Sequence, residues 1–230
     1  MQYIIFFSIL SIFAALLSAY LGDHGRYHPK IILKTMASLM FCTVGVIFSV
    51  QTGNSVYALR LFIFLALSFL GDVLLTLHVV LPEKLKNISN LLGGLLFLGA
   101  HILLFFTLIQ IAKLNLVLLA IQPLLPIIIA ILAKTKVITI TKKQALPCII
   151  YALALNLLLV ACFNIALTKA GSLPFVILVM VAGTAFVISD LFLLLANFGK
   201  SEKIKKQSMY IVMALYYLAQ NIFAFTIFYA

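Results

Sequence analysis

The sequence has no tryptophan, five acidic residues and three cysteines among 230 residues. Without tryptophan, anchoring at a membrane surface falls to tyrosine, lysine and arginine. Cys42, Cys148 and Cys162 lie in apolar segments without the spacing of a disulfide framework or a zinc site, so we interpret them as small buried hydrophobic residues. The chain also lacks a serine nucleophile elbow, a P-loop and a dinucleotide-binding glycine motif, which removes the enzyme classes that use them.

Charge is scarce as well, and this defines the class of protein. Hydrophobic residues make up 65% of the chain and charged residues 9%, which excludes an ordinary soluble domain and indicates a polytopic membrane protein. Eight apolar runs of about 18–25 residues can each cross the hydrocarbon core as a helix. We expect them near residues 3–20, 31–50, 57–78, 88–111, 115–133, 146–167, 173–197 and 208–229. Short connectors make successive helices antiparallel neighbours, so the predicted fold is an all-α bundle of eight transmembrane helices in one integral membrane domain, 1–230.

Basic residues dominate the charge, with a formal net charge of +11, and their positions favour membrane topology over nucleic-acid binding. The first, third, fifth and seventh connectors, with the adjoining helix ends, carry Arg26, Lys30, Lys34, Lys84, Lys86, Lys134, Lys136, Lys142, Lys143, Lys200, Lys203, Lys205 and Lys206. The other connectors carry Arg60, Lys113 and Lys169. The odd-numbered connectors are therefore expected in the cytoplasm. The first run lacks the basic start and the cleavage site of a signal peptide, so we expect it to be retained as a helix. With eight spans, both termini should then face the outside of the cell, and the expected location is the inner (cell) membrane of a bacterium.

Two of the acidic residues, Asp72 and Asp190, lie inside apolar runs, where an aspartate costs about 2.5–3.5 kcal/mol on translocon-insertion scales. Each stands between a small residue and a leucine-rich turn, in Gly71-Asp72-Val73-Leu74-Leu75 and Ser189-Asp190-Leu191-Phe192-Leu193. One such aspartate can simply pin two helices by hydrogen bonding, whereas two in matching motifs favour a function. Two carboxyl groups brought together in a dry cavity share a proton, so that one is an acid and the other a base. We predict Asp72 and Asp190 as a catalytic pair.

The two aspartates also suggest an internal repeat. His101 follows an alanine 29 residues after Asp72, and Gln220 follows an alanine 30 residues after Asp190. A parallel repeat of four helices plus four explains this spacing, because an even number of helices in each half preserves orientation. Both carboxylates should then lie at similar depth, nearer the cytoplasmic side. The predicted half-repeats are 1–111 and 112–230.

Further polar residues in the apolar runs are candidates for substrate binding. His101 can polarise a substrate oxygen or orient an aspartate, or it can be a hydrogen-bonded bundle residue. Two aspartates and one histidine could supply the ligands of a zinc site, but no HxxxH or Cys/His spacing supports one, so we expect no metal and no cofactor. Lys34, about one turn inside the second run, either extends to the cytoplasmic interface or contacts a lipid phosphate.

The last apolar run concentrates hydrogen-bonding groups. Tyr216, Tyr217, Gln220 and Asn221 serve either as polar contacts between helices or as substrate-binding residues. Two other groups we interpret as structural: Asn156 and Asn164 as packing hydrogen bonds, and Gly93, Gly94 and Gly99 as sites of close helix approach.

Taken in order along the chain, these residues resemble the YhhN-like lysoplasmalogenase family, eight-helix membrane proteins of bacteria and animals. Two positions depart from the family pattern: Thr35 stands where proline is frequent, and Leu103-Leu104-Phe105 stands where a tyrosine is common. The resemblance rests on Lys34, Leu70-Gly71-Asp72-Val73-Leu74-Leu75, Gly94-Leu95-Leu96-Phe97 with Ala100-His101, Gly183-Thr184-Ala185-Phe186 with Ser189-Asp190, and Tyr216-Tyr217-Leu218-Ala219-Gln220.

The resemblance implies hydrolysis of the vinyl ether bond of lysoplasmalogen, a lysophospholipid, to a fatty aldehyde and glycerophospho-ethanolamine or -choline. Such a bond is cleaved by protonation of its β-carbon to an oxocarbenium ion, which water captures. Paired aspartates fit this chemistry, because one can donate the proton while the other activates water and stabilises the cation. Either aspartate could take either role. The alkenyl chain would come from the bilayer, while the phosphate stays near the basic face.

Other functions are compatible with the same carboxylates. A proton-coupled transporter of a small molecule or lipid would use them to carry protons between repeated halves. An intramembrane aspartyl protease would need a partner Tyr-Asp motif and a Pro-Ala-Leu segment, which the chain lacks. A membrane protein with a structural role is the remaining alternative.

Overall fold

The computed structural model describes residues 2–53 and 55–230, and in this part of the chain eight helical segments are long and apolar enough to cross a membrane. The predicted all-α polytopic bundle is confirmed, and the protein is an integral membrane protein by this criterion. The segments are α1 (Gln2–Asp23), α2 (Tyr27–Gln51), α3 (Val56–Leu77), α4 (Glu83–Ile109), the 3-10 helix η1 (Leu116–Ile121) with α5 (Leu124–Lys134), α6 (Lys142–Thr168), α7 (Leu173–Phe198) and α8 (Glu202–Tyr229).

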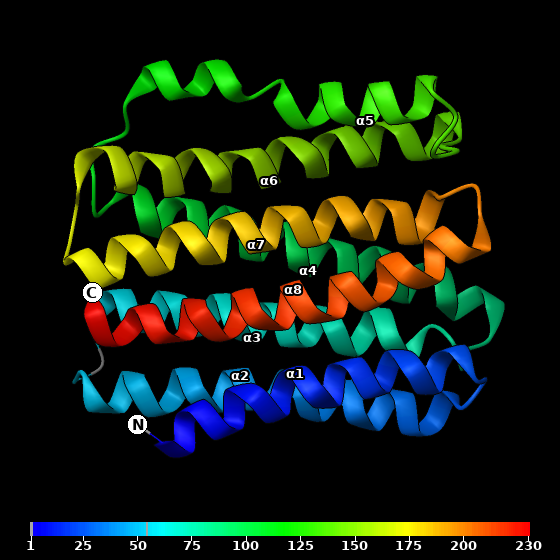
Figure 1. Cartoon of the computed structure of the whole chain (residues 1–230), viewed down its shortest axis with the longest axis horizontal. Coiled ribbons are helices and arrows are strands. Elements are labelled where there is room, and N and C mark those ends of the chain that lie inside the picture. The colour runs from blue at the N-terminus through cyan, green and yellow to red at the C-terminus, as the bar shows by residue number, and fades with distance from the viewer. Residues whose placement is uncertain (1, 54) are drawn as a thin grey trace.

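The helices lie nearly parallel to one another in a slab, with both termini at the same end (Figure 1). At one edge α1 packs on α2, and α2 in turn packs on α3 and α8. In the middle α3 packs on α4 and α7 packs on α8, with α8 and α7 in front of α3 and α4 in the view of Figure 1. Beyond them α6 packs on α4 and α7, and α5 lies on the outer side of α6. Large apolar side chains remain exposed along the sides of the bundle, as expected for a surface in contact with lipid.

Polar helix starts extend some spans beyond the expected apolar runs. The helices α4, α6 and α8 begin four to six residues early, at Glu83, Lys142 and Glu202. At α6 a capping box forms between Thr141 and Gln144, which satisfies free N–H groups of the first turn. These turns carry charge, so they lengthen the helices at the water-facing end without adding apolar sequence.

The fifth span differs from the continuous helix expected over 115–133. It consists of η1 and α5, interrupted at Pro123, because proline has no N–H to donate to the preceding turn. The Asn156 amide donates to the carbonyl oxygens of Ile121 at 2.5 Å and Gln122 at 2.7 Å, so a side chain of α6 satisfies groups that the break leaves free. Asn164 donates to the carbonyl of Ala112 at 3.2 Å, and the structural interpretation of both asparagines is confirmed.

Close approach of α3 and α4 depends on Gly71 and Gly93. A β-carbon at Gly71 would lie 2.7 Å from the ring of Phe97, and one at Gly93 would lie 2.8 Å from Leu75. The expectation for Gly93 is therefore confirmed. It is wrong for Gly94 and Gly99, because nothing lies within 4 Å of a β-carbon at either position.

Candidate active site in the bundle

Asp72, near the end of α3, is held by a cation and two hydroxyl groups. Lys34 Nζ lies 3.2 Å from Asp72 Oδ1, and the Asp72 side chain is 4% exposed. Ser38 Oγ and the Tyr216 hydroxyl each donate to Asp72 Oδ2 at 2.8 Å. Lys34 and Ser38 are one helical turn apart on α2, so both reach the same side of α3. Asp72 is therefore a carboxylate whose charge is matched inside the bundle.

One of the two expectations for Lys34 was that its side chain extends to the cytoplasmic interface, and the structure does not show this. Its side chain is 13% exposed and points to Asp72 instead. The neighbouring Tyr217 hydroxyl hydrogen-bonds with Ser38 Oγ at 2.8 Å and donates to the Lys34 carbonyl oxygen at 3.4 Å. The two adjacent tyrosines thus contact Asp72 differently. Tyr216 donates to Asp72 directly, whereas Tyr217 hydrogen-bonds with Ser38, which in turn donates to Asp72.

Asp190, on α7, has different surroundings. The Tyr151 hydroxyl of α6 donates to Asp190 Oδ2 at 2.7 Å. His101 Nε2 lies 3.9 Å from the same oxygen, which is too long for a hydrogen bond. His101 Nδ1 is bonded to the Phe97 carbonyl oxygen at 2.6 Å, while its Nε2 has no hydrogen-bond partner among the described residues. Within that part of the chain no lysine or arginine pairs with Asp190, so its charge would be unmatched.

A set of aromatic rings separates the two aspartates. Phe186, fully buried on α7, packs edge-on against Tyr216 at 5.5 Å between ring centroids and against His101 at 4.9 Å. No hydrogen bond joins Asp72 to Asp190 among the described residues. The structure brings both acids into one buried aromatic and polar centre, but it does not show the direct sharing of a proton that the sequence suggested. Each carboxylate is instead bonded to a different neighbour: Asp72 to α2 and α8, and Asp190 to α6.

The contacts cross between the two halves of the chain. Asp72 is held by α2 of its own half and by α8 of the other half. Asp190 is held by α6 of its own half and lies beside His101 of α4 in the other half. This is the pattern that a parallel repeat of four helices would produce, although the repeat itself stays a prediction.

The remaining predicted site residues fall into two kinds. Asn221 donates to the Tyr217 carbonyl oxygen at 2.7 Å and to Ser11 Oγ at 3.3 Å, so it connects α8 with α1. Gln220 is fully buried, and neither its Nε2 nor its Oε1 has a hydrogen-bond partner in the described chain. No group of three His, Cys, Asp or Glu side chains in residues 2–53 and 55–230 is arranged to hold a metal ion.

Sequence reasoning missed two residues that contact the aspartates, Ser38 and Tyr151. Ser38 could have been found from its position four residues after Lys34, on the same helix face. Tyr151 lies 39 residues before Asp190, and Lys34 lies 38 residues before Asp72. The proposed repeat could therefore have indicated Tyr151, because its position before Asp190 corresponds to that of Lys34 before Asp72.

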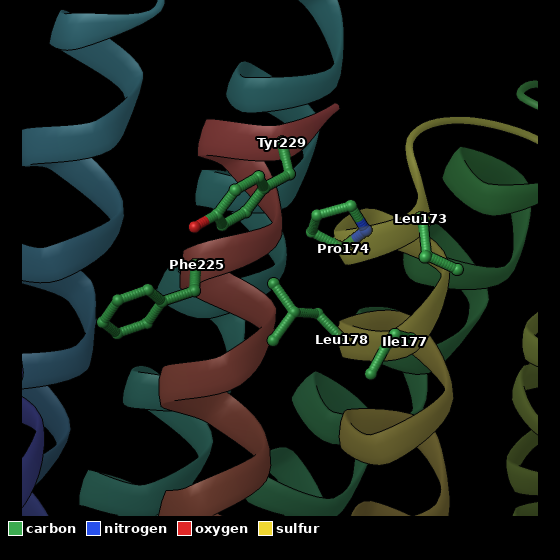
Figure 2. A pocket seen from close by; sticks show the side chains of 6 residues that line it. All are labelled: Leu173, Pro174, Ile177, Leu178, Phe225 and Tyr229. Atoms are coloured by element: carbon green, nitrogen blue, oxygen red, sulfur yellow. The ribbon is translucent and has the colours of Figure 1, made fainter.

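A hollow of about 370 Å³ lies elsewhere, between the start of α7 and the end of α8 (Figure 2). Its walls are almost entirely apolar: Leu173, Pro174, Ile177, Leu178, Phe225 and Tyr229. Leu173 is 17 residues from Asp190 along α7, which is about 25 Å of helix. At this distance the hollow is not part of the site around the two aspartates.

Comparison with known proteins gives one assignment. No curated protein and no solved structure shows a significant match to the chain. A comparison with protein families matches residues 29–227, which is most of the chain and includes both aspartates with all their partners. The chain belongs to the YhhN family.

Proposed function

We propose that this protein is a membrane hydrolase that cleaves the vinyl ether bond of a lysoplasmalogen, releasing a fatty aldehyde and glycerophospho-ethanolamine or -choline. Membership of the YhhN family and the resemblance of its motifs support this class of reaction. The observation that carries the proposal is the unlike surroundings of two buried aspartates. Asp72 is matched by Lys34, whereas Asp190 has a hydroxyl donor and no lysine or arginine partner among the described residues.

These surroundings suggest different roles. Asp190 can hold a proton without leaving a buried charge unmatched, so it is the proposed acid, which protonates the β-carbon of the vinyl ether. The resulting oxocarbenium ion is stabilised by the negative charge left on Asp190. Water then adds to the cationic carbon and gives up a proton, which restores Asp190. The hemiacetal collapses to aldehyde and alcohol, so the net reaction consumes one water molecule.

Asp72 is the proposed permanent carboxylate of the site. Bound to Lys34, Ser38 and Tyr216, it holds the Tyr216 ring against Phe186. The planar vinyl ether would lie along Phe186, between Tyr216 and His101. There the unpartnered Nε2 of His101 can accept the proton from the attacking water and return it to Asp190, whose Oδ2 lies 3.9 Å away. Lys34 uses one of its three N–H groups for Asp72 and keeps others for a lipid phosphate.

The substrate and its approach follow from the proposal. The alkenyl chain would reach the site from the bilayer between helices, and the phosphate would remain at the basic end of the bundle. We place the protein in the inner membrane of a bacterium, with the basic connectors in the cytoplasm. The bilayer and the lysophospholipid are its proposed partners.

Aldehyde release from purified protein and lysoplasmalogen in detergent tests the function. Asp72→Asn and Asp190→Asn should abolish release. Asp23→Asn is the matched control, because Asp23 is exposed and accepts a hydrogen bond from the Tyr210 hydroxyl at 3.1 Å, away from both buried aspartates. Wild-type protein that releases no aldehyde across pH, detergent and metal conditions would refute the proposal. A transporter would instead show proton-linked flux in sealed vesicles and no turnover in detergent.

A further inference from the structure

Two buried polar side chains near Asp72 lack hydrogen-bond partners. Gln220 on α8 and Ser68 on α3 are both fully buried, and Gln220 Nε2, Gln220 Oε1 and Ser68 Oγ all lack a partner among the described residues. Gln220 lies near the Tyr216 hydroxyl, but the contact between them lacks hydrogen-bond geometry, and that hydroxyl donates to Asp72. Burying a polar group without a hydrogen-bond partner destabilises the folded protein. A bound ligand could supply the hydrogen bonds that these three atoms lack.

Helix geometry places these two side chains opposite each other. Tyr216 of α8 contacts Asp72 of α3, and Phe223 of α8 packs on Phe64 of α3 with 5.5 Å between ring centroids. Numbers rise along α8 as they fall along α3, so the helices are antiparallel. Gln220 lies between Tyr216 and Phe223 on one face, since residues three and four apart share a face.

On the facing helix, the same periodicity puts Ser68 between Phe64 and Asp72. Ser68 and Gln220 therefore occupy one level, one helical turn from the Tyr216–Asp72 contact. The ring of Phe186 borders this level, because it packs on Tyr216 at 5.5 Å and on Phe223 at 6.4 Å. Polar atoms at the level thus lie next to the ring where the reacting bond is proposed to sit.

The chemistry of the two side chains selects one kind of group. A carboxamide offers both donors and an acceptor, and a serine hydroxyl offers one of each. A hydroxyl group of a ligand can donate to Gln220 Oε1 and accept from Gln220 Nε2 or Ser68 Oγ. An ester oxygen can only accept, and a methylene group can do neither, so both would leave buried polar atoms unpaired.

We propose that Ser68 and Gln220 bind the free hydroxyl of the lipid substrate, next to the bond that is cleaved, and so select lysolipids over lipids acylated at that position. This inference rests on the proposed function for the identity of the lipid. The site discriminates by hydrogen bonding, and a site built to bind a hydroxyl rejects an analogue that lacks it far more strongly than an apolar pocket rejects a change in size.

Binding of uncleavable lipids tests the site separately from catalysis. The probes are a saturated 1-O-alkyl lysophospholipid with a free 2-hydroxyl and its 2-deoxy analogue, titrated into wild-type protein in detergent. Wild type should bind the hydroxyl lipid about 10- to 100-fold more tightly. Gln220→Leu and Ser68→Ala should each reduce that ratio to a few-fold by weakening binding of the hydroxyl lipid, with little effect on the deoxy lipid.

Gln122→Leu is the matched control, because Gln122 Nε2 is also buried without a partner but lies between η1 and α5. It should keep the wild-type ratio. If Gln220→Leu fails to fold, Ser68→Ala decides, since removal of an unpaired hydroxyl leaves the packing intact. Equal binding of both lipids by wild type, or a ratio unchanged by Ser68→Ala and Gln220→Leu, would overturn the site and leave these atoms to a structural water.

Cleavage of the two corresponding vinyl ether lipids separates failure of the site from failure of the function. Selective binding without release of aldehyde from either lipid would uphold the hydroxyl site and refute the proposed hydrolase. Equal kcat/KM for both lipids, together with equal binding, would uphold the hydrolase and refute the site.

Discussion

At the scale of single residues, the centre of the bundle contains two aspartates that differ only in their neighbours. Asp72 has an ammonium group at 3.2 Å, and Asp190 has a phenol hydroxyl at 2.7 Å. In a low-dielectric interior such neighbours decide the role of a carboxyl group more than the residue type does. The two aspartates should therefore respond differently to the same substitution.

Replacement of each aspartate by asparagine should affect stability unequally. Asp72→Asn leaves the Lys34 ammonium buried without its counter-charge, which costs about 3–5 kcal/mol in a fully buried pair. Asp190→Asn removes no cation partner and should cost about 0.5–1.5 kcal/mol, the value of one hydrogen bond. Thermal unfolding in detergent should show the lower Tm for Asp72→Asn. Adding Lys34→Met should restore most of the loss, and equal Tm values for the two single variants would contradict the ion pair.

Tyr151 should matter for activity more than for stability. Tyr151→Phe removes the hydroxyl that fixes Asp190, so aldehyde release should fall at least about tenfold while the free energy of unfolding changes by about 0.5–1.5 kcal/mol. Tyr57→Phe is the control, because the Tyr57 hydroxyl has a comparable hydrogen bond to Thr226 at 2.7 Å, away from both aspartates. A similar loss of activity in both variants would show a general effect on packing.

At this scale the sequence indicates the residues that are energetically costly to place in a membrane and misses those that are not. Asp72, Asp190 and His101 stand out because charged or ionisable groups are rare in apolar runs. Ser38 and Tyr151 do not, since serine and tyrosine are ordinary in transmembrane helices. That Lys34 pairs with Asp72 also could not be predicted, because a lysine near a helix end reaches the interface equally well.

At the scale of helices, hydropathy predicts how many spans there are but not how each is built. The fifth run is as apolar as the others, and its break appears only through Pro123 and the carbonyl groups that Asn156 satisfies. The glycines show the same limit. Gly93 and Gly94 are neighbours in the sequence, and only the position of α3 determines which of them is needed.

Substitution of these neighbouring glycines should give opposite results. Gly93→Ala forces a β-carbon against Leu75 and separates α3 from α4, which should cost about 1–3 kcal/mol and reduce activity by displacing Asp72. Gly94→Ala meets nothing within 4 Å and should be neutral, or stabilising by about 0.5–1 kcal/mol because alanine favours a helix. Tm and aldehyde release measure both effects. Loss of activity in Gly94→Ala alone would contradict the packing of α4.

The attachment of the fifth span should depend on α6. Asn156→Leu leaves the carbonyl groups of Ile121 and Gln122 without their donor in an apolar environment, which should cost about 1–3 kcal/mol. Because α5 packs mainly on α6, folded protein should keep its activity. Thermal unfolding and aldehyde release of the same sample check both parts. An inactive but folded variant would show that α5 contributes to the site.

At the scale of the whole molecule, the sequence predicts eight spans with successive spans antiparallel. It does not predict which spans that are not successive pack against one another. Contacts between successive helices follow from short connectors. The contacts of α2 with α8 and of α4 with α6 do not, because they join segments from different halves. These contacts surround both aspartates, so the composition of the site could be predicted only in part.

Orientation in the membrane is the prediction that belongs to this scale. In a background without Cys42, Cys148 and Cys162, single cysteines at Lys113 and Lys169 should react with an impermeant maleimide in intact cells, because basic residues are few on that side. Cysteines at Lys136 and Lys203 should react only after the membrane is permeabilised.

The fold adds a constraint that charge does not provide. The backbone of the fifth connector pairs with that of the seventh, with Thr139 N to Phe198 O at 2.8 Å and Lys200 N to Val137 O at 3.1 Å. Both connectors must therefore lie on one side of the membrane, whichever side that is. Labelling of Lys136→Cys and Lys203→Cys together in intact cells would reverse the orientation and keep the bundle, whereas labelling of only one of them would contradict the pairing and with it the arrangement of α5 to α8.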